Sequence, residues 1–331
     1  MHTDRPPGAT VLDVRDLTTV YALPSGAATA VDSVSFDIRA GETLGFVGES
    51  GSGKSVMALS IVGLLDRPGR VRRGQILFDG RNLRTLDDRD MCAIRGARIG
   101  YVFQEPMTAL DPVWTIGDHL IEALMLHDLA TRRSAPGKAI ALLEAVRLPN
   151  ASARLHDYPH QLSGGMRQRV CIAIAIACQP ALLIADEPTT ALDVTIQAEI
   201  LDLLREMRQT LGLAMLLITH DLGVIAETAD RVAVMYAGRI VESGPVRDVL
   251  RAPQHPYTRG LVASLPERTP GAVLHPIAGL VPQLGAFPSG CSFHPRCPDR
   301  FAVCDTAVPP LYGAGSEHSV RCFLHDAHAA R

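Results

Sequence analysis

Eight consecutive residues, Gly48 to Ser55 (GESGSGKS), carry the strongest chemical signal in this 331-residue chain. They match the pattern G-x-x-x-x-G-K-[ST], in which glycines let successive backbone N–H groups turn inward around phosphate oxygens. Lys54 can reach the terminal phosphates, and Ser55 can offer its hydroxyl to Mg²⁺. A glycine- and serine-rich surface loop is the simpler alternative. The complete pattern favours a site for a nucleoside triphosphate.

The residues on either side of this loop supply the elements that must position it. Thr43 to Val47 is an apolar run that predicts a buried strand, and Lys54 to Leu65 has the pattern of a helix. A helix that begins at the loop directs the positive end of its dipole at a bound anion. This strand–loop–helix context therefore supports phosphate binding.

Further along the chain, strands and helices alternate. Residues Ala181 to Ala185 are apolar on both faces, as expected of a central parallel strand. A helix is predicted over about Thr195–Leu211, with strands over Leu213–Ile218 and Arg231–Tyr236. Such alternation predicts a mainly parallel sheet covered by helices. The first 45 residues instead resemble strands and turns.

Composition excludes several classes of protein. The net charge of −3 gives no overall case for nucleic acid binding. No apolar stretch reaches the roughly 18 residues expected of a membrane-spanning helix. Nucleotide chemistry points to the cytosol, where structural disulfides are rare, so the seven cysteines are interpreted as thiols or metal ligands.

Two further segments carry chemistry. Asp186 and Glu187 end the apolar strand, where Asp186 can join the Mg²⁺ shell and Glu187 can lie beside the γ-phosphate. A structural ion pair at a strand end is the alternative. A second helix is predicted to begin with a hydroxyl and two glycines, at Ser163, Gly164 and Gly165. The amides at its N-terminus can form a second anion site, and an ordinary capped helix start is the alternative.

Together these motifs resemble the ABC transporter ATPase family over about residues 11–250. In that family the Leu-Ser-Gly-Gly segment completes the ATP site of the opposite subunit. Gln104 matches the Q-loop glutamine, Asp193 the D-loop and His220 the switch histidine. Tyr21 lies 27 residues before the loop, where the family has an aromatic that stacks on adenine; a half-buried strand tyrosine is the alternative.

The resemblance implies a role for each matching residue. Glu187 and His220 are the catalytic pair, and Asp186, Ser55 and Gln104 hold Mg²⁺. Ser163, Gly164, Gly165 and Asp193 serve the ATP site of the partner. The residues expected to bind ATP in the same chain are Tyr21, Gly48, Glu49, Ser50, Gly51, Ser52, Gly53, Lys54, Ser55, Val56 and Gln104.

Three segments resemble one branch of that family, the oligopeptide and dipeptide importers, whose relatives also carry nickel. They are Gln104–Pro112 (QEPMTALDP), Tyr158–Gln161 (YPHQ) and His255–Leu261 (HPYTRGL). The last resembles the start of the branch's C-terminal extension, although a proline-rich linker would look similar. Some members carry an iron–sulfur cluster in that extension.

The extension of this chain contains four cysteines: Cys291, Cys297, Cys304 and Cys322. Their spacing is neither that of a zinc ribbon nor that of a bacterial ferredoxin. Four thiolates can nevertheless hold a 4Fe-4S cluster, which we expect, or a zinc ion; unligated thiols are the third possibility. The other three cysteines lie in helical, largely apolar patterns and are expected to be buried: Cys92, Cys171 and Cys178.

The expected fold is α/β: a P-loop NTPase core of the ABC ATPase type with a mainly parallel sheet, an antiparallel β subdomain and a helical subdomain. The predicted domains are 1–257, with the helical subdomain at about 105–178, and a cysteine-containing extension at 258–331.

The resemblance implies the ATPase subunit of a bacterial peptide importer at the cytoplasmic face of the membrane. Its expected partners are a homologous ATPase, identical or not, two membrane permeases and an external solute-binding protein, and its expected cofactors are ATP and Mg²⁺. A soluble ABC ATPase of translation or DNA repair, an importer of nickel or another small solute, and a metal-sensing module are the alternatives. The complete Glu187 and His220 pair argues against the last.

Overall fold

The computed structural model describes residues 6, 8–24, 26–265, 277–315 and 317–326. The chain forms two compact units. The first unit contains the residues up to Leu12, Ile38–Glu42 and Thr85–Leu216. The second contains Asp13–Asp37, Thr43–Arg84 and Leu217–Arg331. Part of the predicted extension, residues 266–276, 316 and 327–331, lies outside the described residues.

Two largely buried strands of the first unit pair in parallel. β6 (Ile99–Val102) pairs with β7 (Leu182–Asp186), with Ile99 opposite Leu182 and Val102 opposite Ala185. All five residues of β7 are buried, as its apolar sequence predicts. β8 (Ala214–Thr219) follows β7 in the strand order, and the division between the units falls within it. Two strand ends thus present polar residues beside one another, Gln104 after β6 and Glu187 after β7.

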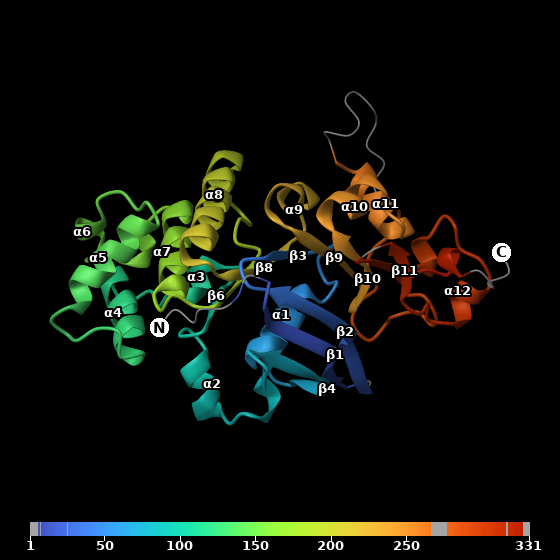
Figure 1. The fold of residues 1–331 in the computed structure, drawn as a ribbon, viewed down its shortest axis with the longest axis horizontal. Coiled ribbons are helices and arrows are strands. Elements are labelled where there is room, and N and C mark those ends of the chain that lie inside the picture. The colour runs from blue at the N-terminus through green and yellow to red at the C-terminus, as the bar shows by residue number, and fades with distance from the viewer. Residues whose placement is uncertain (1–5, 7, 25, 266–276, 316, 327–331) are drawn as a thin grey trace. The chain divides into compact units, whose positions relative to one another are not determined.

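Helices make up most of the rest of the first unit, and Figure 1 shows α4 to α7 gathered in one group. Thr115 and Asp118 form a reciprocal capping box at the start of α4, and the apolar faces of α4, α5 and α7 pack on one another. The helices of this unit are α2 (Asp88–Ile94), α3 (Pro106–Ala109), α4 (Ile116–Leu126), α5 (Ala135–Ala145), α6 (Ala151–Arg154), α7 (Gly164–Ile176) and α8 (Val194–Leu211), with a 3₁₀ turn at Pro159–Gln161.

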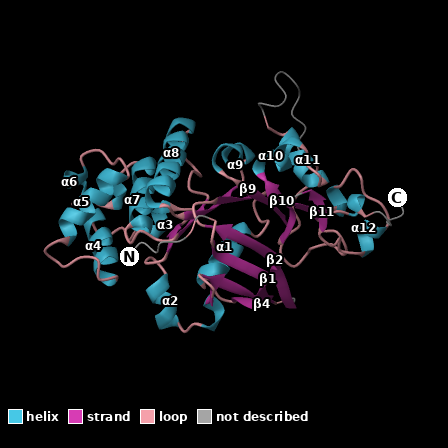
Figure 2. Ribbon diagram, viewed as in Figure 1, coloured by secondary structure: helices cyan, strands magenta, loops and turns pink. Residues whose placement is uncertain are grey.

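The second unit contains an antiparallel sheet made from the N-terminal part of the chain. Its strand order is β2-β1-β4-β5, and β1, β2 and β4 lie side by side in Figure 2. Val34 and Ile38 of β2 are buried, as their alternation with polar residues predicts. The strands are β1 (Thr10–Leu23), β2 (Gly26–Arg39), β4 (Gly69–Phe78) and β5 (Arg81–Asn82), followed by a 3₁₀ turn at Leu83–Thr85.

The strand that carries the glycine-rich loop, β3 (Thr43–Val47), pairs in parallel with β9 (Arg231–Tyr236), and β9 pairs antiparallel with β10 (Arg239–Pro245). α1 (Lys54–Val62) begins at the end of the loop. It ends three residues earlier than predicted because Gly63 adopts a left-handed conformation at the C-cap. The remaining helices near these strands are α9 (Leu222–Thr228), α10 (Val246–Arg251) and α11 (Pro256–Ala263).

The C-terminal part of the chain continues the same sheet. β12 (His318–Val320) pairs with β10, and β11 (Tyr312–Gly315) pairs with β12, both antiparallel. α12 (Val303–Thr306) and two 3₁₀ turns, His294–Arg296 and Phe323–His325, are its other regular elements. The buried rings of Tyr236, Tyr257 and Phe293 pack on one another, with centroids 4.7 to 5.4 Å apart. Phe293 therefore shares a core with the strand next to β3.

The α/β class, the parallel and antiparallel sheets and the helical region are confirmed. The predicted boundary near Tyr257 falls inside α11 and stays a prediction. Within the described residues, no helix is both long and apolar enough to span a bilayer.

Candidate functional site

The glycine-rich loop joins β3 to α1 in the second unit, as predicted. A Cβ on Gly48 would collide with the carbonyl oxygen of Met235, and one on Gly53 would lie 2.7 Å from that of Ala30. Gly53 also has φ of 103°, which disfavours a side chain. Close backbone contacts thus require these glycines, and α1, which has no acidic residue in its first turn, begins directly after them.

Lys54 is held inside the loop. Its side chain is buried, with 4% of the residue exposed. Nζ donates to the carbonyl oxygens of Gly48 at 2.7 Å and Glu49 at 3.2 Å, and lies 3.4 Å from Oγ of Ser52. An ammonium among three oxygens is in the position where phosphate oxygens can replace those partners.

Tyr21, on β1 of the same unit, is half-buried. A Cβ on Gly69, at the start of β4, would lie 2.7 Å from two atoms of its ring, so the glycine leaves room for the ring. Burial and the nearby charge of Asp66 raise the pKa of its hydroxyl. Stacking of Tyr21 on adenine stays a prediction.

The two acids at the end of β7 lie in the first unit and are both buried, Asp186 with 3% and Glu187 with 8% of the residue exposed. The hydroxyl of Tyr101 donates to Oδ2 of Asp186 at 3.1 Å. Oε2 of Glu187 accepts from Thr190 Oγ1 at 2.8 Å and from Gln104 Nε2 at 3.4 Å.

These contacts bring together two of the predicted site residues, Gln104 and Glu187. Glu187 also has φ of 47°, a left-handed conformation that is uncommon outside glycine. Backbone outliers of this kind cluster at functional sites, and the carboxylate of this residue accepts from Gln104.

The Leu-Ser-Gly-Gly segment begins α7, as predicted. Oγ of Ser163 accepts from the backbone N–H of Met166 at 3.3 Å and caps the helix, while the Ser163 residue itself is exposed. A Cβ on Gly165 would lie 2.6 Å from Ile196 of α8, so this glycine lets two helices approach. Asp193 caps α8 by accepting from the N–H of Ile196 at 3.0 Å.

His220 follows β8 in the second unit and is exposed. Its neighbour Asp221 caps α9 by accepting from the N–H groups of Gly223 and Val224. The second unit therefore contains Tyr21, the glycine-rich loop and His220. The first contains Gln104, Asp186, Glu187, Ser163 and Asp193.

Four cysteines lie in the C-terminal tail, the part of the chain beyond residue 250: Cys291, Cys297, Cys304 and Cys322. All four line one small cavity of about 10 Å³ in the second unit, together with His255, Phe293 and Phe301. Burial and, to a smaller extent, neighbouring thiols raise the pKa of Cys297 and of Cys322 to about 11. Four thiols are a suitable donor set for iron or zinc. Among the described residues, however, no group of three or more His, Cys, Asp or Glu side chains is arranged to hold a metal ion.

One expectation about the other cysteines is wrong. Cys171 is buried, and burial raises its pKa to about 12, while Cys178 is half-buried. Cys92 is exposed, because Met91 is the one fully buried residue of α2 and Cys92 lies on its solvent-facing side. The prediction overlooked how many charged residues surround Cys92 in the sequence.

Several residues with contacts at these sites were missed. Tyr101 could have been noticed as the one hydroxyl in the apolar strand that leads to Gln104. Thr190 has no comparable signal. Tyr257 and Arg296 both contact Glu49 of the loop, although they follow it in the sequence by 208 and 247 residues. No local sequence pattern predicts contacts at such a separation.

Comparisons with known proteins find two family models and several close relatives. The family model described as ABC transporter matches residues 31–190, and that described as oligopeptide/dipeptide transporter, C-terminal region, matches residues 241–304. The dipeptide transport ATP-binding protein of Bacillus subtilis is 49% identical, over 96% of both chains. The oligopeptide transport ATP-binding protein of Salmonella typhimurium is 47% identical, over 96% of this chain and 94% of its own.

Solved structures are similar as well. A dimeric ATP-binding cassette in a post-hydrolysis state, bound to ADP and Pi, has a TM-score of 0.65 and 28% identity, covering 71% of this chain and 99% of its own. A dimeric cassette of a bacterial ABC transporter has a TM-score of 0.64 and 29% identity with the same coverage.

Proposed function

This chain belongs to the ABC transporter family, and we propose that it is the subunit that binds and hydrolyses ATP to drive the import of di- or oligopeptides across the cytoplasmic membrane. The main structural support for ATP hydrolysis is Glu187. It is buried at the end of β7, and its carboxylate accepts hydrogen bonds from Gln104 and Thr190. The match of residues 241–304 to the oligopeptide/dipeptide C-terminal region supports the peptide substrate.

We assign the steps of hydrolysis to the predicted residues. The amides of the loop and Lys54 bind the phosphates, and Tyr21 stacks on the adenine. Ser55, Gln104 and Asp186 would hold Mg²⁺, which neutralises charge on the phosphates when it is bound. Glu187 accepts a proton from the attacking water, and His220 orients that water. Positioning and electrostatics supply most of the rate enhancement in phosphoryl transfer.

The proposal includes partners. The dimeric state of the related cassettes supports pairing with a homologous ATPase, whose ATP would meet Ser163, Gly164, Gly165 and Asp193 of this chain. Import further requires two membrane permeases and an external solute-binding protein, and places this chain at the cytoplasmic face of the membrane.

Reconstitution tests the assignment. In vesicles that contain two permeases and the partner ATPase, a solute-binding protein loaded with a mixture of di- and oligopeptides should stimulate ATP hydrolysis and peptide uptake. Lys54→Ala should abolish both, since it removes the buried ammonium from the loop. If RNA or DNA stimulated ATP hydrolysis in the absence of permeases, the result would instead support a soluble ABC ATPase. Uptake of Ni²⁺ without uptake of peptides would support the nickel alternative.

We infer further that the four tail cysteines ligate a 4Fe-4S cluster. The support is that all four thiols line a single cavity with phenylalanine rings in its wall. At about 10 Å³ that cavity does not fit a cluster, and the described residues are not arranged to hold a metal ion, so the thiols would have to move apart to ligate one. Their raised pKa values keep Cys297 and Cys322 protonated at neutral pH in the absence of metal, so ligation must release protons. A structural role is preferred, because ATP-driven import requires no electron transfer.

Iron analysis tests the cluster. Protein purified without oxygen should contain about four irons per chain, the content of a cubane held by four thiolates. Cys297→Ser should remove iron, whereas Cys92→Ser, a change at an exposed cysteine outside the tail, should not. One zinc per chain would favour the zinc alternative, and a metal-free chain with a folded tail would leave four ordinary thiols.

A further inference from the structure

Glu49, the second residue of the glycine-rich loop, is held by two residues from the C-terminal part of the same unit. Arg296 donates to both of its carboxylate oxygens, from Nη1 at 2.7 Å and from Nη2 at 3.0 Å. The hydroxyl of Tyr257 accepts from the backbone N–H of Glu49 at 2.9 Å. Side chain and backbone of this loop residue are therefore both fixed by residues beyond position 250.

Arg296 is itself held in place before it reaches the loop. Its side chain is only 5% exposed. Nε donates to the carbonyl oxygen of Ala278 at 2.8 Å and Nη2 to that of Ile277 at 3.3 Å, while Nη1 lies 3.4 Å from the hydroxyl of Tyr236. A buried guanidinium with this many partners has few other orientations, and a bidentate pair of this kind is among the stronger hydrogen-bonded contacts in proteins.

Tyr257 is fixed by a chain of hydrogen bonds. Its N–H donates to Nδ1 of His255 at 3.0 Å, and the N–H of His255 donates to the buried carboxylate of Glu242 at 2.8 Å. Burial lowers the pKa of His255 to about 3, so the ring is neutral at physiological pH and can accept this bond. The same carboxylate accepts from Nε2 of His318 on β12. The chain of contacts thus runs from the last strand of the tail to the loop.

This arrangement matters because of the charge of Glu49. A carboxylate within a phosphate-binding loop repels the phosphates of ATP, and in a partly buried place that repulsion is weakly screened. The Arg296 guanidinium cancels this charge. The bond to Tyr257 also occupies the N–H of Glu49, which leaves the following amides to face the phosphates.

We propose that the C-terminal tail is a positioning element for the phosphate loop, acting through Arg296 and Tyr257 on Glu49. The proposal rests on the assignment of ATP binding to this loop. By linkage, ATP binding and the folded tail stabilise each other to the same extent. The tail thereby gains a role in nucleotide affinity in addition to any ligand of its cysteines.

Arg296→Gln in the full chain is the main test. It should raise the Kd for ATP by about 10-fold, within the range typical of coupling between two sites, because the charge of Glu49 is no longer cancelled. The rate at saturating ATP should stay near that of the wild type, since the residues assigned to hydrolysis are unchanged. The double variant Glu49→Gln/Arg296→Gln should recover most of the affinity, an effect that a merely structural role of Arg296 does not give.

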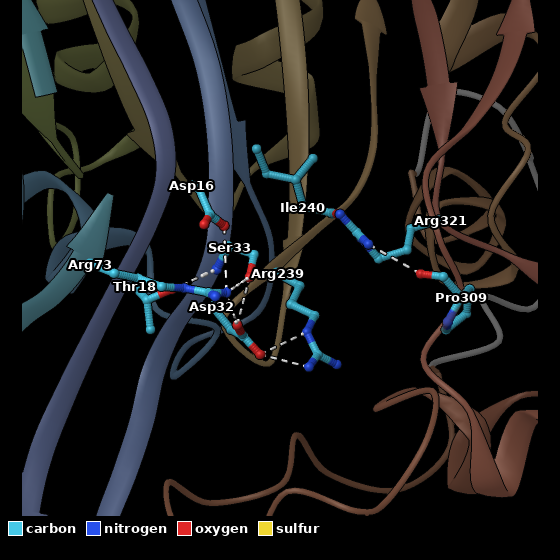
Figure 3. A network of polar contacts seen from close by, with 9 residues as sticks. All are labelled: Asp16, Thr18, Asp32, Ser33, Arg73, Arg239, Ile240, Pro309 and Arg321. Atoms are coloured by element: carbon cyan, nitrogen blue, oxygen red, sulfur yellow. Dashed lines mark hydrogen bonds and ion pairs between the residues drawn. The ribbon is translucent and has the colours of Figure 1, made fainter. Parts of the chain in front are cut away.

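Arg321→Gln is the matched control. Figure 3 shows Arg321 between Ile240 and Pro309, whose carbonyl oxygens accept from it at 3.3 and 3.1 Å, so it anchors the tail without touching the loop. It should leave the Kd for ATP near the wild-type value. An equal loss of affinity in Arg321→Gln, or no recovery in the double variant, would overturn the proposal.

Hydrogen exchange checks the reciprocal effect. ATP should slow exchange of tail amides in the wild type and in Arg321→Gln, but much less in Arg296→Gln. Should Arg296→Gln fail to fold, Tyr257→Phe serves in its place. It removes the hydroxyl that accepts from the N–H of Glu49 and should also weaken ATP binding. If Lys54→Ala left ATP binding intact, the assignment of ATP binding to this loop would be wrong. That result differs from one in which Lys54→Ala abolishes ATP binding while Arg296→Gln leaves it unchanged, which would refute only the role of the tail.

Discussion

Replacing Glu187 with glutamine is expected to slow ATP hydrolysis in the assembled transporter by about 10²-fold or more, the scale of a lost general base. The side chain keeps its shape, so the amide that replaces the carboxylate can still accept from Thr190 and remain next to Gln104. ATP affinity should be retained, because the change removes a proton acceptor and leaves the phosphate loop intact. Steady-state hydrolysis and equilibrium binding of ATP measure the two quantities separately.

A closed dimer with trapped ATP is the second expected property of this variant, since hydrolysis is what releases the two subunits. Glu206→Gln is the matched control: Glu206 lies on α8 of the same unit and forms an exposed ion pair with Arg147, so hydrolysis should be nearly normal. Turnover near the wild-type rate in Glu187→Gln would refute its assignment as the base.

Ser163→Arg is expected to lower hydrolysis by the assembled transporter by about 10²-fold, the scale of losing one preorganised donor to a reacting group. Ser163 is exposed at the start of α7, so a long side chain there would occupy the place of the partner's γ-phosphate. ATP binding to the isolated subunit should be nearly unchanged, because its own phosphate loop is untouched. Comparison of the isolated subunit with the assembly measures this difference.

Loss of the helix cap alone does not explain such a drop, since an N-cap contributes only about 1 kcal/mol. Thr115→Arg provides the control because it removes the cap of α4 in the same unit at a place with no proposed ATP contact. Equal losses in both variants would mean that Ser163 acts through helix stability. A large loss of ATP affinity in the isolated Ser163→Arg subunit would mean that Ser163 contacts the ATP bound to its own subunit and not that of the partner.

Much of the fold follows from local patterns. The sequence predicts β9 over Arg231–Tyr236, and the strand occupies those residues, because an apolar run flanked by polar residues has little freedom in where it can be buried. The phosphate loop lies between its predicted strand and helix for the same reason. The end of α1 differs by three residues, since the pattern continues to Leu65 while the backbone turns at Gly63.

The contacts that hold Glu49 could not be predicted. Arg296 and Tyr257 approach it from a proline-rich segment with no clear periodicity. The packing of Tyr236, Tyr257 and Phe293, together with the pairing of β12 with β10, holds that segment near the loop. A tertiary contact of this kind depends on the whole core. The pairing of Gln104 with Glu187 was implicit in the parallel strands, since their carboxyl ends meet at one edge of the sheet.

The pairing of β3 with β9 has a consequence for how the protein is made. The N–H of Thr43, the first residue of β3, donates to Asp230, which is 187 residues later in the chain. At a synthesis rate of about 5–20 residues per second, β3 is synthesised roughly 10–40 s before β9. All five residues of β3 are buried in the finished protein. The strand must therefore wait as exposed apolar chain during translation, which makes this interval the period of greatest risk for misfolding and the natural point for chaperone binding.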